Sequence, residues 1–134
     1  MSTPTFNSTI TLQNELAKKV ILESSQKNKT YICGVDVAYR NNIAYCSAVM
    51  MNKDSLKVQH SINLTLKVKQ HYLPSFLMLR ESEPIINILK SLENRIDILL
   101  IDGHGVLHPR RCGLACYVGV IIDRPTIGVA KSLL

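Results

Sequence analysis

The stretch that decides the fold is residues 98–111, which read ILLIDGHGVLHPRR. Its opening apolar run, without alternation, is typical of an interior strand that is covered on both faces. The run ends on Asp102, and ligand sites of open α/β folds collect at the carboxyl ends of such strands. Gly103 and Gly105 let the backbone approach a ligand closely, and the pair Arg110–Arg111 favours an anion. We therefore expect a site here in which a carboxylate binds a metal ion and a guanidinium group binds phosphate.

Length and composition favour one globular domain with a polyanionic partner. The chain has 134 residues, of which 46% are hydrophobic, enough for a real core. Its net charge of +6 favours nucleic acid without proving it, because solvated lysines give the same balance. The longest apolar stretch, near residues 118–122, is too short to span a bilayer, so no membrane partner is expected. The N-terminus lacks a secretory pattern and the four cysteines are expected to be reduced, as in a cytoplasmic protein.

The N-terminal part is predicted to be a loose segment followed by a helix. Residues 1–8 are polar and are expected to be loose. Leu12, Leu16 and Val20 recur every fourth residue and predict the apolar stripe of a helix of about 13 residues.

Three strands are expected next, joined by turns short enough to demand an antiparallel meander, over residues 31–39, 43–51 and 55–66. A basic loop over 67–79 leads to a helix with Ser82 as its cap and Pro84 in its first turn. The last elements are a strand, a buried helix and a strand, over residues 96–101, 111–123 and 126–129. Long crossovers suit parallel pairing of the fourth strand beside the first. We predict an α/β fold, an antiparallel βββ followed by αβαβ in one mixed sheet with flanking helices.

Three acidic residues occupy informative places in this fold. Asp36 interrupts the apolar first strand between Gly34 and Ala38, and a lone buried charge there needs a partner or a metal ion. Glu81 is expected at the start of the following helix, and Asp102 at the end of the fourth strand. If the first and fourth strands are parallel neighbours, the three carboxylates converge as magnesium or manganese prefers. Two such ions could activate water and steady the leaving oxygen in phosphodiester cleavage.

Each of these residues also has a purely structural explanation. Asp36 could pair with a core cation, Glu81 could serve the helix dipole and Asp102 could cap a turn. It is their joint placement at element ends that favours a metal site. His108 could be a hydrogen-bonding strand exit or a proton-transfer group, and Lys131 could be surface charge or a stabiliser of charge on phosphate.

Two further groups leave alternatives open. Arg110 and Arg111 could form a solvated helix start or hold a phosphate. The segment Tyr72-Leu73-Pro74 could be a packed loop or a wedge that fills the gap left by an everted base. A zinc site is the rival interpretation of four residues spaced by four, His104, His108, Cys112 and Cys116. However, Gly105 and Pro109 break the helix that would put both histidines on one face.

Several motifs together resemble the endonuclease V (deoxyinosine 3′-endonuclease) family. They follow in family order over most of residues 31–134: GVDVAY at 34–39, HYLP at 71–74, RE at 80–81, DGHG at 102–105, HPRR at 108–111 and PTIGVAK at 125–131. The resemblance implies a ribonuclease H-like fold, with residues 1–134 forming a single endonuclease V domain. It also implies metal-dependent hydrolysis, with Mg²⁺ or in its place Mn²⁺, of the second phosphodiester bond 3′ to an inosine. The products would carry a 3′-hydroxyl and a 5′-phosphate.

The same resemblance assigns roles to matched positions. The metal ligands would be Asp36, Glu81 and Asp102, assisted in the chemistry by His108 and Lys131. The strand-separating wedge would be Tyr72, Leu73 and Pro74, and the pocket for the flipped base would be lined by Gly103 and Gly105. The partner would be DNA that contains deoxyinosine, with inosine in RNA as a further substrate.

The chain departs from the family pattern at two places. His71 and Ser75 stand where the family has proline and glycine around the wedge. Family members also continue for several dozen residues beyond Leu134, so this chain is expected to be a short form, with one sheet face exposed or covered by a second copy. The alternatives are a catalytically weak or inactive inosine- or nucleic-acid-binding module and another ribonuclease H-like nuclease.

Overall fold

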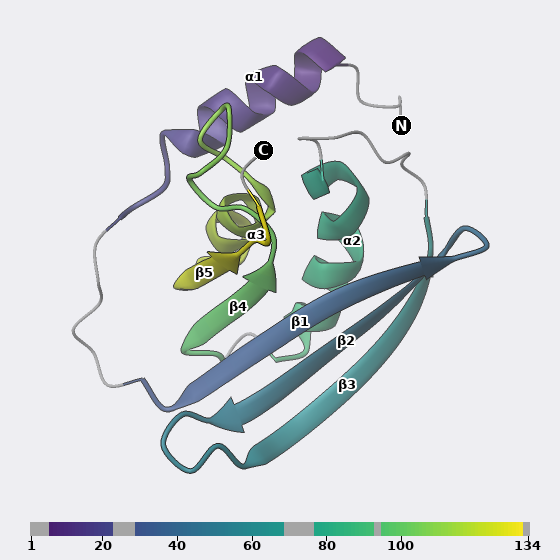
Figure 1. The fold of residues 1–134 in the computed structure, drawn as a ribbon, viewed down its shortest axis with the longest axis vertical. Coiled ribbons are helices and arrows are strands. Elements are labelled where there is room, and N and C mark those ends of the chain that lie inside the picture. Colours follow the sequence, from purple (N-terminus) through teal and green to yellow (C-terminus); the bar gives the residue numbers. More distant parts are fainter. Residues whose placement is uncertain (1–5, 23–28, 69–76, 93–94, 133–134) are drawn as a thin grey trace.

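The computed structural model describes residues 6–22, 29–68, 77–92 and 95–132. Its elements are α1 (Phe6–Ala17), β1 (Tyr31–Arg40), β2 (Ile43–Asn52), β3 (Val58–Lys67), α2 (Leu77–Lys90), β4 (Ile98–Asp102), α3 (Leu114–Ile122) and β5 (Thr126–Val129). The strands form one mixed sheet in the order β3-β2-β1-β4-β5 (Figure 1). The predicted order of strands and helices and the parallel pairing of β4 with β1 are confirmed.

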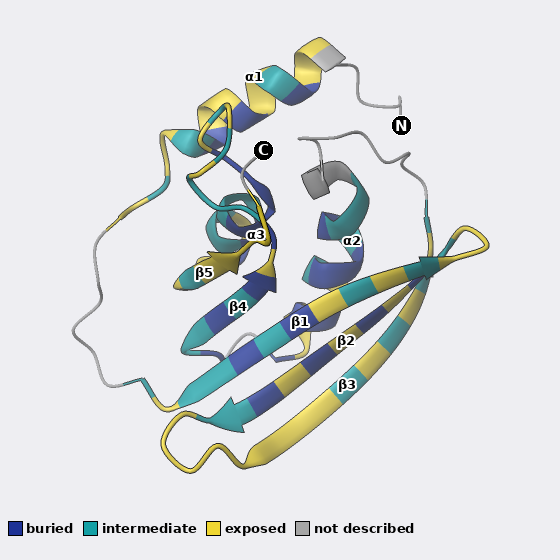
Figure 2. Cartoon of the chain, in the orientation of Figure 1, coloured by how far each residue is buried: buried dark blue, intermediate teal, exposed yellow. Residues whose placement is uncertain are grey.

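The hydrophobic core lies between the sheet and the helices α2 and α3. These helices contact each other as well as the strands, so they cover the same face of the sheet. Residues of β2 alternate between buried and exposed along the strand, as Figure 2 shows. In the described part of the chain the opposite face stays exposed, with Tyr45 46% and Val129 58% exposed.

The turn between β1 and β2 is built from two residues with left-handed backbone. Asn41 and Asn42 have φ of 50° and 61°. Asparagine tolerates this conformation, and a two-residue turn with positive φ at both positions matches the right-handed twist of its strands. The predicted hairpin is confirmed, with Arg40 paired to Ile43.

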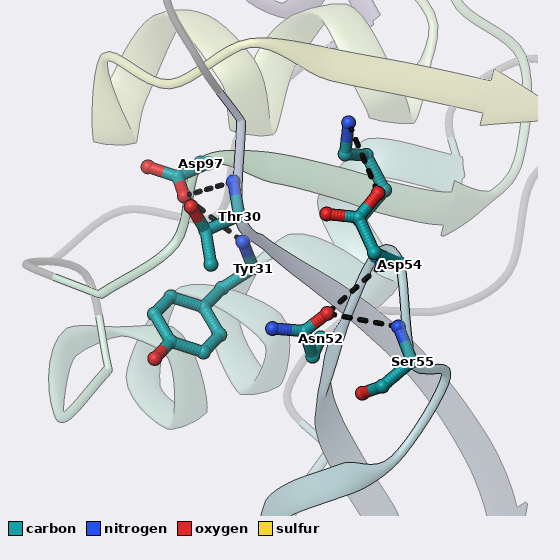
Figure 3. A network of polar contacts seen from close by, with 7 residues as sticks. Thr30, Tyr31, Asn52, Asp54, Ser55 and Asp97 are labelled. Atoms are coloured by element: carbon teal, nitrogen blue, oxygen red, sulfur yellow. Dashed lines mark hydrogen bonds and ion pairs between the residues drawn. The ribbon is translucent and has the colours of Figure 1, made fainter.

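The third strand begins later than the alternation predicts. The Asn52 side chain accepts hydrogen bonds from the backbone N–H groups of Asp54 and Ser55, at 2.9 and 3.0 Å (Figure 3). This asparagine turn competes with sheet pairing. Leu56 then has a φ of 58° and is 66% exposed. The prediction of a strand from residue 55 is therefore wrong, because local side-chain bonds extend the turn up to Val58.

Asp97 fastens the start of β1 to the start of β4. Its carboxylate accepts hydrogen bonds from the backbone N–H groups of Tyr31 and Thr30, at 2.9 and 2.8 Å (Figure 3). These bonds stabilise the charged form and hold the pKa of Asp97 below its usual value. These bonds therefore hold the starts of the two parallel strands together and fix their register.

The helix α2 corrects two sequence predictions. It begins at Leu77, so Ser82 is not its cap and Pro84 lies inside it rather than in the first turn. Glu81 is therefore part of the helix body. Because proline has no N–H, Pro84 cannot donate the helical hydrogen bond to the carbonyl of Arg80, four residues before it. That carbonyl needs another donor, and the hydroxyl of Tyr39 on β1 supplies it at 3.1 Å.

The first helix buries a face that the apolar stripe does not predict. Leu12 is 40% exposed and Val20 lies beyond the helix, whereas Thr9, Gln13 and Leu16 are buried. The helix also includes residues 6–8, which were expected to be loose. Polar atoms on the buried face bond to a distant loop, which overrides the hydrophobic pattern. None of the described helices is long and apolar enough to cross a membrane.

Candidate active site

Asp36 and Asp102 lie at matching positions on neighbouring parallel strands. The β1–β4 register runs from Ile32 opposite Ile98 to Val35 opposite Ile101, and the next residue on each strand is an aspartate. In-register residues of adjacent strands point to the same face. Both aspartates are exposed, and β1 continues past the end of β4. The sheet therefore places two carboxylates side by side where the parallel pairing stops.

Glu81 reaches the same region from α2. The pKa of Glu81 is raised to about 7, first by burial of its side chain and then by the negative charges of Asp36 and Asp102. The guanidinium of the neighbouring Arg80 opposes this rise without cancelling it. Both carboxylates are therefore close enough to repel the Glu81 charge through a poorly solvated environment. The charges of Asp36 and Asp102 therefore both act on the carboxyl group of Glu81.

The donor set fits a divalent cation in its chemistry. It consists of carboxylate oxygens, which Mg²⁺ and Mn²⁺ prefer, and their mutual repulsion is what a cation would relieve. Within the described residues no group of three or more His, Cys, Asp or Glu side chains is arranged to hold a metal ion as it stands. One reason is visible at Asp36, whose Oδ1 accepts a hydrogen bond from the N–H of Val37 at 2.9 Å.

The zinc alternative has no support in the same residues. His104 Nε2 lies 2.6 Å from the carbonyl oxygen of Ser132, and His108 Nδ1 accepts a hydrogen bond from the N–H of Arg110. Cys112 is buried, and its pKa is raised to about 11 by that burial, which disfavours the thiolate a zinc ion needs. These side chains are occupied in the loop and the core rather than gathered around a cation.

The loop after β4 is held by very close backbone contacts. Gly103 donates its N–H to the carbonyl of Val129 at 2.8 Å, and Gly113 donates to the carbonyl of Gly105 at 3.0 Å. A Cβ on Gly113 would lie 2.2 Å from the carbonyl oxygen of His104, and one on Gly128 would lie 2.6 Å from that of Gly103. Only glycine leaves room for the loop at these positions. The predicted base-pocket residues, Gly103 and Gly105, are therefore rigidly placed.

A pocket of about 1040 Å³ opens on one side of this loop. Its lining includes Gly105 and Lys131, both singled out in the sequence, together with His104 and Ser132. Gly103 is buried and is not part of the lining. The contact between His104 and Ser132 ties the loop to the segment that carries Lys131. Lys131 itself is exposed, just after the end of β5.

Gln13 is a site-loop residue that sequence reasoning missed. It is fully buried on α1, its side-chain oxygen accepts a hydrogen bond from Arg110 Nε, and its amide donates to the carbonyl of Cys112 at 3.2 Å. Arg110 is half-buried, so it does more than form a solvated helix start, whereas Arg111 is exposed with a φ of 57°. No sequence signal marks Gln13, because a polar residue on a helix predicts exposure.

The predicted wedge cannot be placed in this site. Tyr72, Leu73 and Pro74 lie outside the described residues, as do His71 and Ser75.

Comparison with protein families and known sequences gives a consistent picture. A family model described as Endonuclease V matches residues 14–134. The chain is 41% identical over 126 residues to endonuclease V of Rippkaea orientalis, and 39% identical over 123 residues to that of Pyrococcus abyssi. Each alignment covers 92% of this chain.

Solved structures agree with the sequence comparison. Endonuclease V from Streptomyces avermitilis has a TM-score of 0.88 and 34% identity over 97% of this chain. Endonuclease V from Ciona intestinalis has a TM-score of 0.85 and 32% identity over 92% of this chain. The latter was crystallised with a 24mer DNA that contains an inosine followed by a ribo-adenosine. These proteins have a ribonuclease H-like fold, so the predicted fold class is confirmed.

The relatives are longer than the matched region. The chain spans 55% of the Rippkaea protein and 62% of the Pyrococcus protein, and 56% of the Ciona chain. The matched part nevertheless includes the two aspartates, Glu81 and the glycine-rich loop. With the family model covering nearly all of its residues and the same fold in solved members, this chain belongs to the endonuclease V family.

Proposed function

We propose that the chain is a metal-dependent endonuclease that acts on deaminated adenine in DNA. It would hydrolyse the second phosphodiester bond 3′ to a deoxyinosine and leave a 3′-hydroxyl and a 5′-phosphate. The observation that carries the proposal is that Asp36 and Asp102 occupy matching positions on β1 and β4 and that both charges act on Glu81, in a member of the endonuclease V family. The free thiols of all four cysteines support the cytoplasm as its location.

In this proposal Asp36, Glu81 and Asp102 hold Mg²⁺ or Mn²⁺. When bound, the cation activates water and stabilises negative charge on the phosphate. His108 accepts a hydrogen bond on Nδ1, so a neutral ring carries its proton on Nε2, and this nitrogen would take part in proton transfer. Lys131 stabilises charge that develops on phosphate. Arg110, oriented by Gln13, contributes to phosphate binding.

The base is expected to enter beside the glycine-rich loop. Gly105, which lines the pocket, brings its backbone next to a flipped hypoxanthine, while the buried Gly103 supports the loop from behind. Tyr72, Leu73 and Pro74 fill the gap that the base leaves. Inosine in RNA is a further substrate within this proposal.

The direct test is cleavage of a duplex with a single inosine, in Mg²⁺ and in EDTA. Magnesium-dependent cutting at the second bond 3′ to inosine supports the proposal. Equal cutting of undamaged or branched duplexes would identify another ribonuclease H-like nuclease instead. Binding without cutting would identify an inosine- or nucleic-acid-binding module instead.

The raised pKa of Glu81 predicts how stability depends on pH in the absence of metal. The folded protein holds the Glu81 proton up to about pH 7, whereas the unfolded chain loses it near 4.5. The native state therefore binds more protons between these values, and its stability falls as pH rises through this window. We expect the melting temperature of wild type minus that of Glu81→Gln, both measured in EDTA, to decline from pH 4.5 to pH 7.

Comparison with the Glu81→Gln variant cancels the contributions of other titrating groups. Mg²⁺ is expected to stabilise wild type more at pH 8 than at pH 5, because it competes with the proton for the same carboxylate. A melting-temperature difference between the two proteins that does not change with pH would contradict this prediction.

A further inference from the structure

Tyr39 connects the two elements that carry the acidic residues. It lies near the end of β1, three positions after Asp36, and in a strand this spacing places the two side chains on opposite faces. Its half-buried ring lies on the face that α2 covers, beside the helix as Figure 1 shows for the two elements. One side chain of β1 therefore reaches across to the helix that presents Glu81.

Tyr39 contacts Arg80, the residue directly before Glu81, through its hydroxyl and its ring. The Tyr39 hydroxyl donates a hydrogen bond to the carbonyl oxygen of Arg80 at 3.1 Å. The guanidinium carbon of Arg80 lies 4.0 Å from the centre of the Tyr39 ring, a cation–π contact. Backbone and side chain of Arg80 are thus both held by the same tyrosine.

Pro84 explains why the hydroxyl bonds there. In a regular helix the N–H of residue 84 would donate to the carbonyl of Arg80, but proline has none. Leaving a carbonyl in a poorly solvated place without a donor is costly, so the sequence couples a helix-interior proline to a tyrosine on the sheet. The turn of α2 that bears Glu81 is thereby hydrogen-bonded to β1 at the position where proline removes one bond of the helix.

We propose that Tyr39 is a positioning residue that sets Glu81 against Asp36 for divalent-cation binding. The inference rests on the proposed function, because it assumes that these carboxylates bind a cation. Three carboxylates bind a cation more tightly when the strands and the helix that carry them are already fixed relative to one another. Tyr39 does this for the helix, while the β1–β4 register does it for the two aspartates.

The test is direct Mn²⁺ binding, measured by electron paramagnetic resonance on metal-free protein without nucleic acid. Tyr39→Phe removes the hydrogen bond and keeps the ring, and we expect Mn²⁺ to bind about threefold to tenfold more weakly, the value of one net hydrogen bond. Tyr39→Leu also removes the cation–π contact and is expected to weaken binding further. Tyr31→Phe is the matched control, because Tyr31 is a half-buried tyrosine at the other end of β1 from Tyr39.

A second variant tests whether Tyr39 acts by tying α2 to β1 or only by giving the Arg80 carbonyl a hydrogen-bond donor. Pro84→Ala, added to Tyr39→Phe, restores a helical N–H that can donate to the carbonyl of Arg80. We expect this double variant to recover thermal stability in EDTA while its Mn²⁺ affinity stays weakened, because the helix turn is still not tied to β1.

The outcomes distinguish this inference from the proposed function. If the double variant recovers both stability and Mn²⁺ affinity, or if Tyr39→Phe binds Mn²⁺ like Tyr31→Phe, the positioning role is wrong and the proposed function stands. If wild type binds no Mn²⁺, both are wrong. Weakened binding in both Tyr39 variants and in the double variant, with the Tyr31 control unchanged, supports the positioning role.

Discussion

Replacing Asp102 by Ala is expected to abolish magnesium-dependent cleavage of an inosine-containing duplex while the protein stays folded. The exposed Asp102 side chain lies beyond the last β1–β4 pair, so its loss leaves the core intact. In the proposed site it is one of three cation ligands and the one carried by β4. A single electrostatic group in such a site contributes about 10²–10³-fold to rate, and loss of the cation removes more. Cleavage rate at saturating Mg²⁺ is the measurement.

Asp54→Ala provides the matched control for this variant. Asp54 is also an exposed aspartate at a strand end, with a side chain that is 82% exposed in the β2–β3 turn. We expect it to cleave like wild type. A second readout is the Glu81 carboxyl, whose pKa should fall in Asp102→Ala because one of the charges that raise it is gone. Hydrolysis that survives in Asp102→Ala at the rate of the control would show that Asp102 has no part in the chemistry.

Gly113→Ala is expected to destabilise the protein by about 3 kcal/mol, at the upper end of the cost of overpacking a closed site. The added Cβ would lie 2.2 Å from the carbonyl oxygen and 2.7 Å from the carbonyl carbon of His104, so backbone rather than a flexible side chain must move. That carbonyl also accepts the N–H of Ala115 at 3.0 Å, which the displacement would weaken. For a domain of this size the melting temperature should fall by roughly 10 °C.

Gly34→Ala is the control for a glycine-to-alanine change in the same fold. A Cβ at Gly34 would meet no atom within 4 Å, and its backbone is not left-handed. We expect its melting temperature to equal or slightly exceed that of wild type, because alanine restricts the unfolded chain. If Gly113→Ala melts at the same temperature as Gly34→Ala, the loop after β4 is not clamped as its backbone contacts indicate.

Much of the sheet could be predicted from the sequence because its signals are local. The Asn41–Asn42 pair suits a left-handed two-residue turn, and the apolar run that ends on Asp102 marks an interior strand. The parallel pairing then follows from the length of the crossover. Because that pairing sets Asp36 beside Asp102, the meeting of two acidic residues could be expected before any coordinates.

The boundaries and faces of the helices could not be predicted in the same way. Ser82 and Pro84 look like a helix start, but Tyr39 supplies the hydrogen bond that Pro84 cannot, so the helix extends back to Leu77. On α1, burial of Gln13 depends on Arg110, which is 97 residues away. The first is a contact between a side chain and the backbone, and the second is a contact between two polar side chains. Hydrophobic periodicity contains no signal for either of them.

The register between β1 and β4 also sets the order in which the molecule can become competent to bind a cation. β1, β2 and β3 are neighbours along the chain, so their pairing closes only short loops and is expected early in refolding. Pairing of β4 with β1 closes a long loop that contains β2, β3 and α2, and this closure is slower than that of a hairpin. During refolding, Mn²⁺ uptake should therefore lag behind the formation of the hairpins and report the arrival of the central parallel strand.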